Sequence, residues 1–134
     1  MREYYAQDGY PFDEGQSRLA LGALIANEAF GCVWVIDDEE GVAGYLAVTL
    51  GYSLEYGGRD AFIDELYLAE RARGRGAGGA AIEVAEAWCR ARGIRALHLE
   101  VEPHRDQAFA LYRRRGFADR GRRLMTMSLA APAP

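Results

Sequence analysis

The chain has few cysteines, and the two that it has form no recognisable site. Cys32 and Cys89 are isolated in apolar surroundings, and they match neither a metal-ligand spacing nor a disulfide framework. We interpret both as small core residues of a protein in a reducing compartment. We expect no metal site.

Long apolar runs are missing as well. No run approaches the ~20 residues that a membrane-spanning helix needs. The opening segment, MREYYAQDGYPFDEG, lacks the apolar core of a signal peptide. We therefore expect a cytoplasmic protein without a membrane partner.

Basic charge is not in excess. The formal net charge is -4 and the pI is near 5.2, whereas a nucleic-acid-binding module is normally basic overall. We therefore expect no nucleic-acid partner, and the arginines must act locally. Hydrophobic residues make up 50% of the 134, enough for the core of one domain. We predict a single domain over 1–134, with 1–16 and 130–134 irregular.

Periodicity and turn residues predict alternating helices and strands. A helix capped by Ser17 ends near Gly31 and carries Leu21, Leu24 and Ile25 on one stripe. Another helix begins at Ala77, ends near Gly93 and has a stripe of Ala77, Ala80, Ala81, Val84 and Trp88. Strands are predicted over 32–36, 42–54, 61–68, 94–101 and 123–129, and a short helix over 106–116.

The order of these elements predicts the fold class. The early strands are joined by turns and should be antiparallel. Residues 61–101 form a strand, a loop, a helix and a strand, so these two strands should lie parallel, joined by a right-handed crossover. We predict a single-domain α/β protein whose mixed, mostly antiparallel sheet contains this central β-loop-α-β unit.

A glycine-rich and arginine-rich loop, RARGRGAGG, precedes the helix that begins at Ala77. A helix start presents backbone N–H groups without partners and a partial positive charge, which suit an anion. Glycine lets a bulky anion approach the backbone without meeting a Cβ, and arginine adds charge. The glycines are Gly74, Gly76, Gly78 and Gly79, and the arginines are Arg71, Arg73 and Arg75.

The loop also has three other interpretations. It can be a flexible loop with solvated arginines. It is not a Walker loop, because no GK[ST] follows the glycines. It matches the dinucleotide pattern GxGxxG at Gly74, Gly76 and Gly79, with Glu100 near the expected acidic position. In that fold, however, the strand runs almost directly into the first glycine, whereas AERAR intervenes here.

Two spaced segments resemble the GNAT superfamily of acyl-CoA-dependent N-acyltransferases. ELYLAERARGRGAG is similar to its acyl-CoA loop, with the pattern [RQ]xxGx[GA] falling on Arg73, Gly76 and Gly78. LEVEPHRDQAFALYRRRGF is similar to its LxVxxxNxxAxxLYxxxGF segment. The matching residues there are Leu99, Val101, Ala108, Leu111, Tyr112, Gly116 and Phe117.

The sequence departs from the family pattern in two places. Arg105 stands where the family usually has asparagine, so a contact of that side chain with the cofactor is not carried over. The usual first strand is absent, which leaves a sheet edge that a second copy of the chain can cover. A homodimer is therefore expected.

The resemblance implies acetyl-CoA as the co-substrate. Its pantetheine arm would pair with the backbone of Leu66, Tyr67 and Leu68. Its pyrophosphate would lie on the N–H groups of Arg73, Gly74, Arg75, Gly76, Ala77, Gly78 and Gly79.

The resemblance also implies catalytic residues. Tyr112 matches a family tyrosine that often donates a proton to the departing sulfur, although its helical spacing also permits simple core packing. Asp64 and Glu65 should point to opposite faces of their strand, so only one can face the acceptor. Family register favours Asp64 as the base, with a water chain as the alternative. Weaker candidates are Glu100, Glu102 and His104.

The acceptor is expected to be a primary amine. Carboxylates attract a cation, and aromatic residues that can line the site are Tyr4, Tyr5, Tyr10, Tyr52 and Tyr56, with the acidic stretch PFDEG. The expected activity is therefore N-acetyl transfer from acetyl-CoA to a small-molecule or peptide amine. A sensor that binds acyl-CoA without turnover is the alternative.

Overall fold

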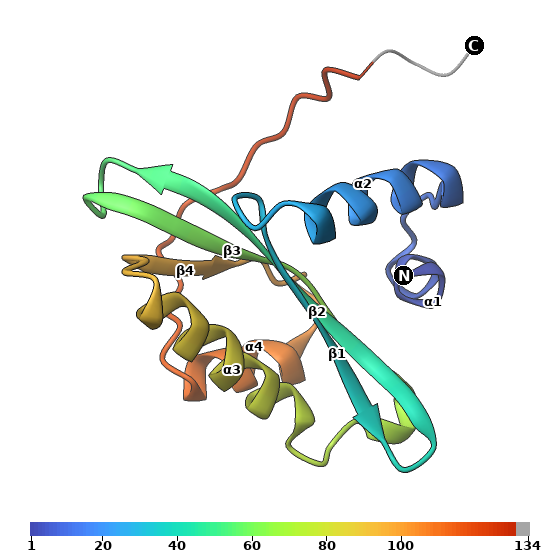
Figure 1. Cartoon of the computed structure of the whole chain (residues 1–134). Helices are drawn as coiled ribbons and strands as arrows, with labels where there is room; N and C mark the ends of the chain where they lie inside the picture. Colours follow the sequence, from blue (N-terminus) through green and yellow to red (C-terminus); the bar gives the residue numbers. More distant parts are fainter. Residues whose placement is uncertain (131–134) are drawn as a thin grey trace.

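The computed structural model describes residues 1–130 (Figure 1). Its helices are α1 (Arg2–Asp8), α2 (Glu14–Ala26), α3 (Ala77–Ala91) and α4 (Asp106–Arg114), with a 3₁₀ turn, η1 (Glu70–Ala72). Its strands are β1 (Gly31–Asp38), β2 (Gly41–Ser53), β3 (Gly58–Leu68) and β4 (Ala96–Leu99).

The strands form one sheet in the order β1-β2-β3-β4. β1, β2 and β3 pair antiparallel through two tight connections, and β4 lies parallel to β3 after the crossover through α3. The predicted mixed, mostly antiparallel sheet is thus confirmed. Within the described residues no strand precedes α1 and α2, as expected.

One face of the sheet is densely packed by α3. Leu46, Val48 and Ile82 are almost fully buried between the sheet and the helix. Burying a large aliphatic side chain contributes roughly 1.5–3 kcal/mol, so this face supplies much of the stability. At its rim, Trp34 of β1 meets Trp88 of α3 edge-on, with ring centroids 5.6 Å apart.

The predicted stripe of α3 was partly wrong. The buried residues are Gly78, Ala81, Ile82, Ala85 and Cys89. Val84, expected inside, is 47% exposed. Both sets of residues have helical spacing. The observed set is buried because it places Ile82 and Cys89 against the sheet.

The opposite face of the sheet carries α1 and α2 (Figure 1). None of the residues of α1 or α2 is fully buried. Of the predicted stripe on α2, Leu21 and Leu24 are partly covered, whereas Ile25 is 65% exposed. This face is therefore covered without being tightly packed.

The prediction that residues 1–16 are irregular was wrong. α1 forms within it and ends at Gly9, whose φ of 73° is left-handed and suits glycine. α2 also begins earlier than the predicted Ser17 cap. Asp13 caps it by accepting a 2.9 Å hydrogen bond from the backbone N–H of Gln16.

The predicted strand over 123–129 was also wrong. This segment is extended but pairs with no strand within the described residues. Its large side chains Leu124, Met125, Met127 and Leu129 are between 67% and 90% exposed. Alternation indicates an extended backbone, but a strand also needs a neighbour. Upstream, Arg122 is paired with Glu55 at 2.7 Å, which ties the segment to the turn between β2 and β3.

β1 and β4 form the two edges of the sheet, and the homodimer stays a prediction. Within residues 1–130, no helix is long and apolar enough to pass through a membrane. The same residues contain no group of three or more side chains placed to hold a metal ion. The predicted irregular tail beyond residue 130 lies outside the described residues.

Candidate active site

A β-bulge in β3 determines where its two carboxylates lie. Val48 pairs with Ile63 and Ala47 with Glu65, so Asp64 is an extra residue between two pairs. Paired residues share a face, and Ile63 belongs to the core on the α3 side. The bulge therefore resets the alternation and turns Glu65 to the α2 side.

The prediction that Asp64 and Glu65 point to opposite faces was accordingly wrong. Both line one pocket between the sheet and α2. The two-residue period holds only for a regular strand, and a bulge breaks it. The structure thus brings together both carboxylates that the sequence singled out.

Glu65 is buried and held by two tyrosines. It is 9% exposed, and its carboxylate accepts hydrogen bonds from the Tyr45 hydroxyl at 3.0 Å and the Tyr5 hydroxyl at 3.5 Å. Burial raises the pKa of Glu65, although the Tyr45 hydrogen bond opposes the shift. Glu65 also helps burial to raise the pKa of Tyr45, so that phenol stays protonated.

Asp64 is the more accessible of the two carboxylates. It reaches solvent along the pocket wall, yet desolvation by the surrounding protein still raises the pKa of its carboxyl. No hydrogen bond within residues 1–130 contributes to this shift. Its oxygens therefore remain available to a ligand.

The pocket has a volume of about 630 Å³. Its floor is the α2-facing side of β2 and β3, where Tyr45, Ala47 and Thr49 alternate along β2. Its roof is α2, and Tyr5 and Phe12 from the N-terminal segment line it as well. Ring contacts hold these together, with the Tyr5 and Phe12 centroids 5.4 Å apart.

β3 and β4 separate beside this pocket. Their pairing ends at Ile63 with Leu99, so Asp64 to Leu68 have no strand neighbour on that side within the described residues. α1 lies against this stretch, because Tyr67 donates a 2.9 Å hydrogen bond to Glu3. The Leu68 carbonyl, predicted to pair with pantetheine, accepts a 2.9 Å hydrogen bond from Arg73.

The glycines of the loop divide into two kinds. Gly74 and Gly76 have φ of 73° and 83°, and nothing lies within 4 Å of a Cβ added to either. They make the turn into α3 and leave open space. Gly78 is buried, and a Cβ there would lie 3.2 Å from Leu111, so its smallness serves packing against α4.

The start of α3 has free donors. Its first backbone bond runs from Ala80 N–H to the Gly76 carbonyl at 3.0 Å. The N–H groups of residues 77–79 therefore have no acceptor within the helix, and no side chain caps its start. Together with the open space at Gly74 and Gly76, this arrangement fits a bulky anion.

The loop arginines differ in their partners. Arg71 pairs with Asp38 at 3.1 Å and is tied to the β1–β2 hairpin. Arg73 contacts only neutral groups, donating to Leu68 and to Gln7 at 3.0 Å. Arg75 is exposed at the turn. Arg73 and Arg75 therefore keep positive charge for a ligand, whereas Arg71 is structural.

Tyr112 lies on α4, partly buried against the core, with its ring 6.0 Å from that of Phe117. Burial raises the pKa of its hydroxyl, so the group is protonated at neutral pH. Tyr4 links it to the pocket: burial raises the pKa of Tyr4, and both Glu65 and Tyr112 are close enough to raise it further. Tyr112 thus combines core packing with a place near Tyr4, which in turn lies near Glu65.

Several other predicted residues lie outside the pocket. Tyr52 is 71% exposed near the end of β2. Tyr56 stacks edge-on against His98, with centroids 5.4 Å apart. Tyr10 donates a hydrogen bond to Glu102, and Arg105 forms an ion pair with Asp8. The loop after β4 therefore contacts the N-terminal segment through Glu102 and Arg105. Glu100 and His104 are exposed.

Tyr45, which contacts Glu65, was missed from the sequence. It lies inside a long apolar strand, and the only signal was that its hydroxyl would need a partner once buried. The stretch PFDEG, predicted to line the site, contributes Pro11, Phe12 and Asp13 to the pocket. Leu21 and Leu24 were predicted to share one stripe of a helix, but the sequence did not show that this stripe covers the pocket.

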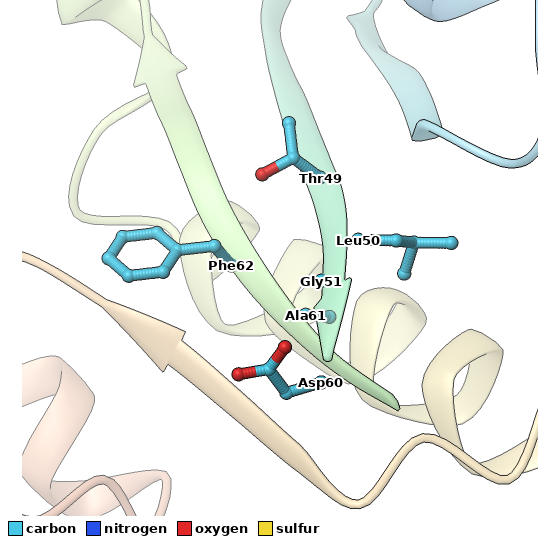
Figure 2. A pocket seen from close by; sticks show the side chains of 6 residues that line it. All are labelled: Thr49, Leu50, Gly51, Asp60, Ala61 and Phe62. Carbon is cyan, nitrogen blue, oxygen red and sulfur yellow. The ribbon is translucent and has the colours of Figure 1, made fainter. Parts of the chain in front are cut away.

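A second, smaller pocket of about 250 Å³ lies further along β2 and β3 (Figure 2). Its carboxylate, Asp60, is directed toward β4 and is bound to His98 at 3.0 Å. Gly51 leaves space for the Asp60 carboxylate, since a Cβ at position 51 would lie 2.8 Å from that group. With its one carboxylate engaged, this pocket is a weaker candidate than the larger one.

Comparison with protein families places the chain among known proteins. The model described as the acetyltransferase (GNAT) family matches residues 1–117. No curated protein matches the chain.

Several solved structures are similar to this chain in fold. An integron cassette protein from the mobile metagenome of the Cole Harbour salt marsh is 34% identical, with a TM-score of 0.85 over 97% of this chain and 80% of that one. A possible acetyltransferase from Clostridium difficile 630 is 18% identical, with a TM-score of 0.80 over 97% and 86%. An aminoglycoside antibiotic 6'-N-acetyltransferase from Acinetobacter haemolyticus is 14% identical, with a TM-score of 0.73 over 91% and 85%. The last two similarities concern the fold alone.

Proposed function

The chain belongs to the GNAT acetyltransferase family, and from that premise we propose that it moves an acetyl group from acetyl-CoA to a primary amine. Acyl transfer is the general activity of the family. The acetyl donor, the amine acceptor and a cytoplasmic location are the proposal. The observation that carries it is the bulge in β3, which sets Asp64 and Glu65 side by side in one pocket where β3 leaves β4.

The glycine loop supports the choice of donor. Free N–H groups at the start of α3, open space at Gly74 and Gly76, and the charges of Arg73 and Arg75 fit a pyrophosphate. The pantetheine arm would run along the unpaired side of β3, from Asp64 to Leu68. Coenzyme A supplies the thioester and a thiol leaving group.

The carboxylates supply the base. An amine reaches the pocket as an ammonium ion, so it must lose one proton before its nitrogen can attack the thioester carbonyl carbon. Asp64 takes this proton directly or through water, because its oxygens are accessible and its raised pKa makes it a better base than an ordinary surface carboxylate. Glu65, held by Tyr45, orients the ammonium ion.

Tyr112 supplies the acid. The carbon–sulfur bond breaks as the nitrogen–carbon bond forms, and the departing sulfur takes up one proton. Tyr112 is protonated at neutral pH because burial raises its pKa, so its hydroxyl has a proton to give. The nitrogen loses a second proton as the amide forms and the sulfur gains one, so the overall reaction from the ammonium ion releases one proton to solvent.

A melting and turnover experiment tests the proposal. Acetyl-CoA should raise the melting temperature by mass action, and NAD should not. Release of free thiol from acetyl-CoA, followed with an amine panel, should exceed the rate without amine. Stabilisation without thiol release would favour the acyl-CoA sensor, and a response to NAD alone would favour a dinucleotide site.

A further inference from the structure

The lining of the pocket between α2 and the sheet has two chemically different parts. The pocket's volume of about 630 Å³ is within the range of small-molecule sites. One part of the lining is Asp64 and Glu65 on β3, and the other is α2 with the residues that follow it.

The first turn of α2 lines the pocket with Gln16 and Ser17, and the rest of the helix gives it an apolar wall. Leu21 and Leu24 face the pocket from the helix, and Phe30 lines it from the loop before β1. Ala20 and Ala23 fill the helical surface between the leucines. Three carboxylates are the charged side chains of this lining within residues 1–130, and the terminal ammonium group of Met1, which also lines the pocket, lowers the pKa of Glu65.

Those carboxylates come from the start of α2 and from β3. Asp13 is used in capping α2 through its bond with the N–H of Gln16. Asp64 and Glu65 stand together on β3, bordered by the rings of Tyr5 and Tyr45. Two carboxylates beside aromatic rings suit one ammonium group, through charge and cation–π attraction.

We propose that the acceptor is a small monoamine with one ammonium group and an apolar body, either a single ring or a branched alkyl chain. The ammonium group lies at Asp64 and Glu65, and the body lies against Leu21, Leu24 and Phe30. This proposal rests on the proposed function and names its substrate class.

Other amines fit less well. A polyamine carries further cations along its chain, and these would lie against Leu24 and Phe30 without a carboxylate partner. An aminoglycoside would bring several hydroxyl and ammonium groups to the same apolar wall. Each buried polar group without a partner lowers affinity.

The test compares acceptors at saturating acetyl-CoA. 2-Phenylethylamine and isoamylamine represent the proposed class, and spermidine, kanamycin and an alanine-led hexapeptide represent the others. We expect kcat/KM for 2-phenylethylamine to exceed that for spermidine at least tenfold, since apolar contacts of one or two methylenes are worth roughly that factor. A preference for spermidine, kanamycin or the peptide would overturn the substrate class while the proposed function stands.

A pair of variants on α2 tests whether the apolar body of the amine lies against Leu24. Leu24→Ser lies in the pocket and should raise KM for 2-phenylethylamine about tenfold with little change in kcat, because it removes uniform binding. Leu19→Ser is the matched control, since Leu19 is 79% exposed on the same helix outside the pocket lining. Equal effects of the two variants would overturn the placement of the apolar body.

Binding separates this proposal from the proposed function. If no amine is acetylated, calorimetric titration of 2-phenylethylamine into the protein with coenzyme A present is decisive. Binding that Leu24→Ser weakens and Leu19→Ser does not would uphold the pocket assignment while the transferase proposal fails. Absence of binding would overturn the substrate class as well.

Discussion

Two helices cover opposite faces of the same sheet, and they do so differently. α3 buries five residues against β2 and β3, while α2 buries none and encloses a pocket of about 630 Å³. Each face is lined by alternate residues of the same strand β2: Leu46 and Val48 pack under α3, and Tyr45 and Ala47 face the pocket. The dense face holds the fold together, and the hollow face has room for a substrate.

The bulge in β3 determines which of its residues belong to each face of the sheet. Before it, Ile63 belongs to the dense core; after it, Glu65 belongs to the hollow side. Without the bulge, Glu65 would be directed into the apolar core, where a carboxylate without a partner is very costly. One extra residue therefore converts a core position into a site position.

The largest expected effect is at Tyr112, which packs at the edge of the dense face and is the proposed acid. Tyr112→Phe keeps the ring and removes the hydroxyl, so the fold should survive. Positioned proton transfer contributes roughly 10²- to 10⁴-fold, and kcat should fall by that order while acetyl-CoA affinity stays nearly constant. Pre-steady-state and steady-state thiol release measure this. A near-normal kcat where chemistry limits turnover would leave Tyr112 as a packing residue only.

The next effect concerns the start of α3, where the dense face opens. Gly76→Asp puts a side chain and a negative charge where the anion must lie, and acetyl-CoA affinity should fall by on the order of a hundredfold or more. Gly57→Asp is the matched control. Gly57 has a similar φ of 79° and open space, but it lies in the turn between β2 and β3. Calorimetric titration with acetyl-CoA compares them, and equal losses would remove the loop from the site.

The unfolding free energies of two variants test directly whether the two faces of the sheet are packed differently. Ile82, 1% exposed under α3, should lose about 2–5 kcal/mol of unfolding free energy when changed to alanine. Leu24→Ala should cost less than about 1 kcal/mol, because Leu24 already borders an open pocket. Urea unfolding of both variants gives the difference. Similar losses would mean that the two faces are equally packed, contrary to the structure.

The sequence predicted what depends on local spacing. The loop that leads into α3, the crossover to β4 and the segment around Tyr112 all follow short patterns of glycine and apolar residues, and the structure contains each. The bulge at Asp64 was not predictable in this way, because it is defined by the register with β2. Nor was the unpaired segment 123–129, whose alternation says nothing of whether a neighbouring strand exists.

α1 is a third feature that the sequence did not predict. It is a seven-residue helix without a buried residue, too short to be stable by itself or to show a periodic pattern. It is held instead by contacts distant in sequence, such as Tyr67 with Glu3 and Arg73 with Gln7. Such contacts exist only after the sheet has formed, so no local pattern of the N-terminal segment reveals them.

The smallest expected effect is a pH dependence on the hollow side. Burial raises the pKa of Asp64 above its unfolded value, so its contribution to stability is full below the unfolded pKa and is lost as the pH rises through the folded pKa. Relative to the wild type, Asp64→Asn should therefore gain stability between about pH 4 and pH 7. Because Asp64 is partly exposed, the gain should be only about a few tenths of a kcal/mol.

Melting curves across this range measure the difference between wild type and variant. Glu39→Gln, in the exposed turn between β1 and β2, controls for the loss of one surface charge. Adding 2-phenylethylamine should shrink the difference, because an ammonium group beside Asp64 lowers the pKa of the carboxyl again. A variant that gains nothing as the pH rises, or a gain that the amine leaves unchanged, would mean that the Asp64 carboxyl is not desolvated on the pocket wall and does not face the amine.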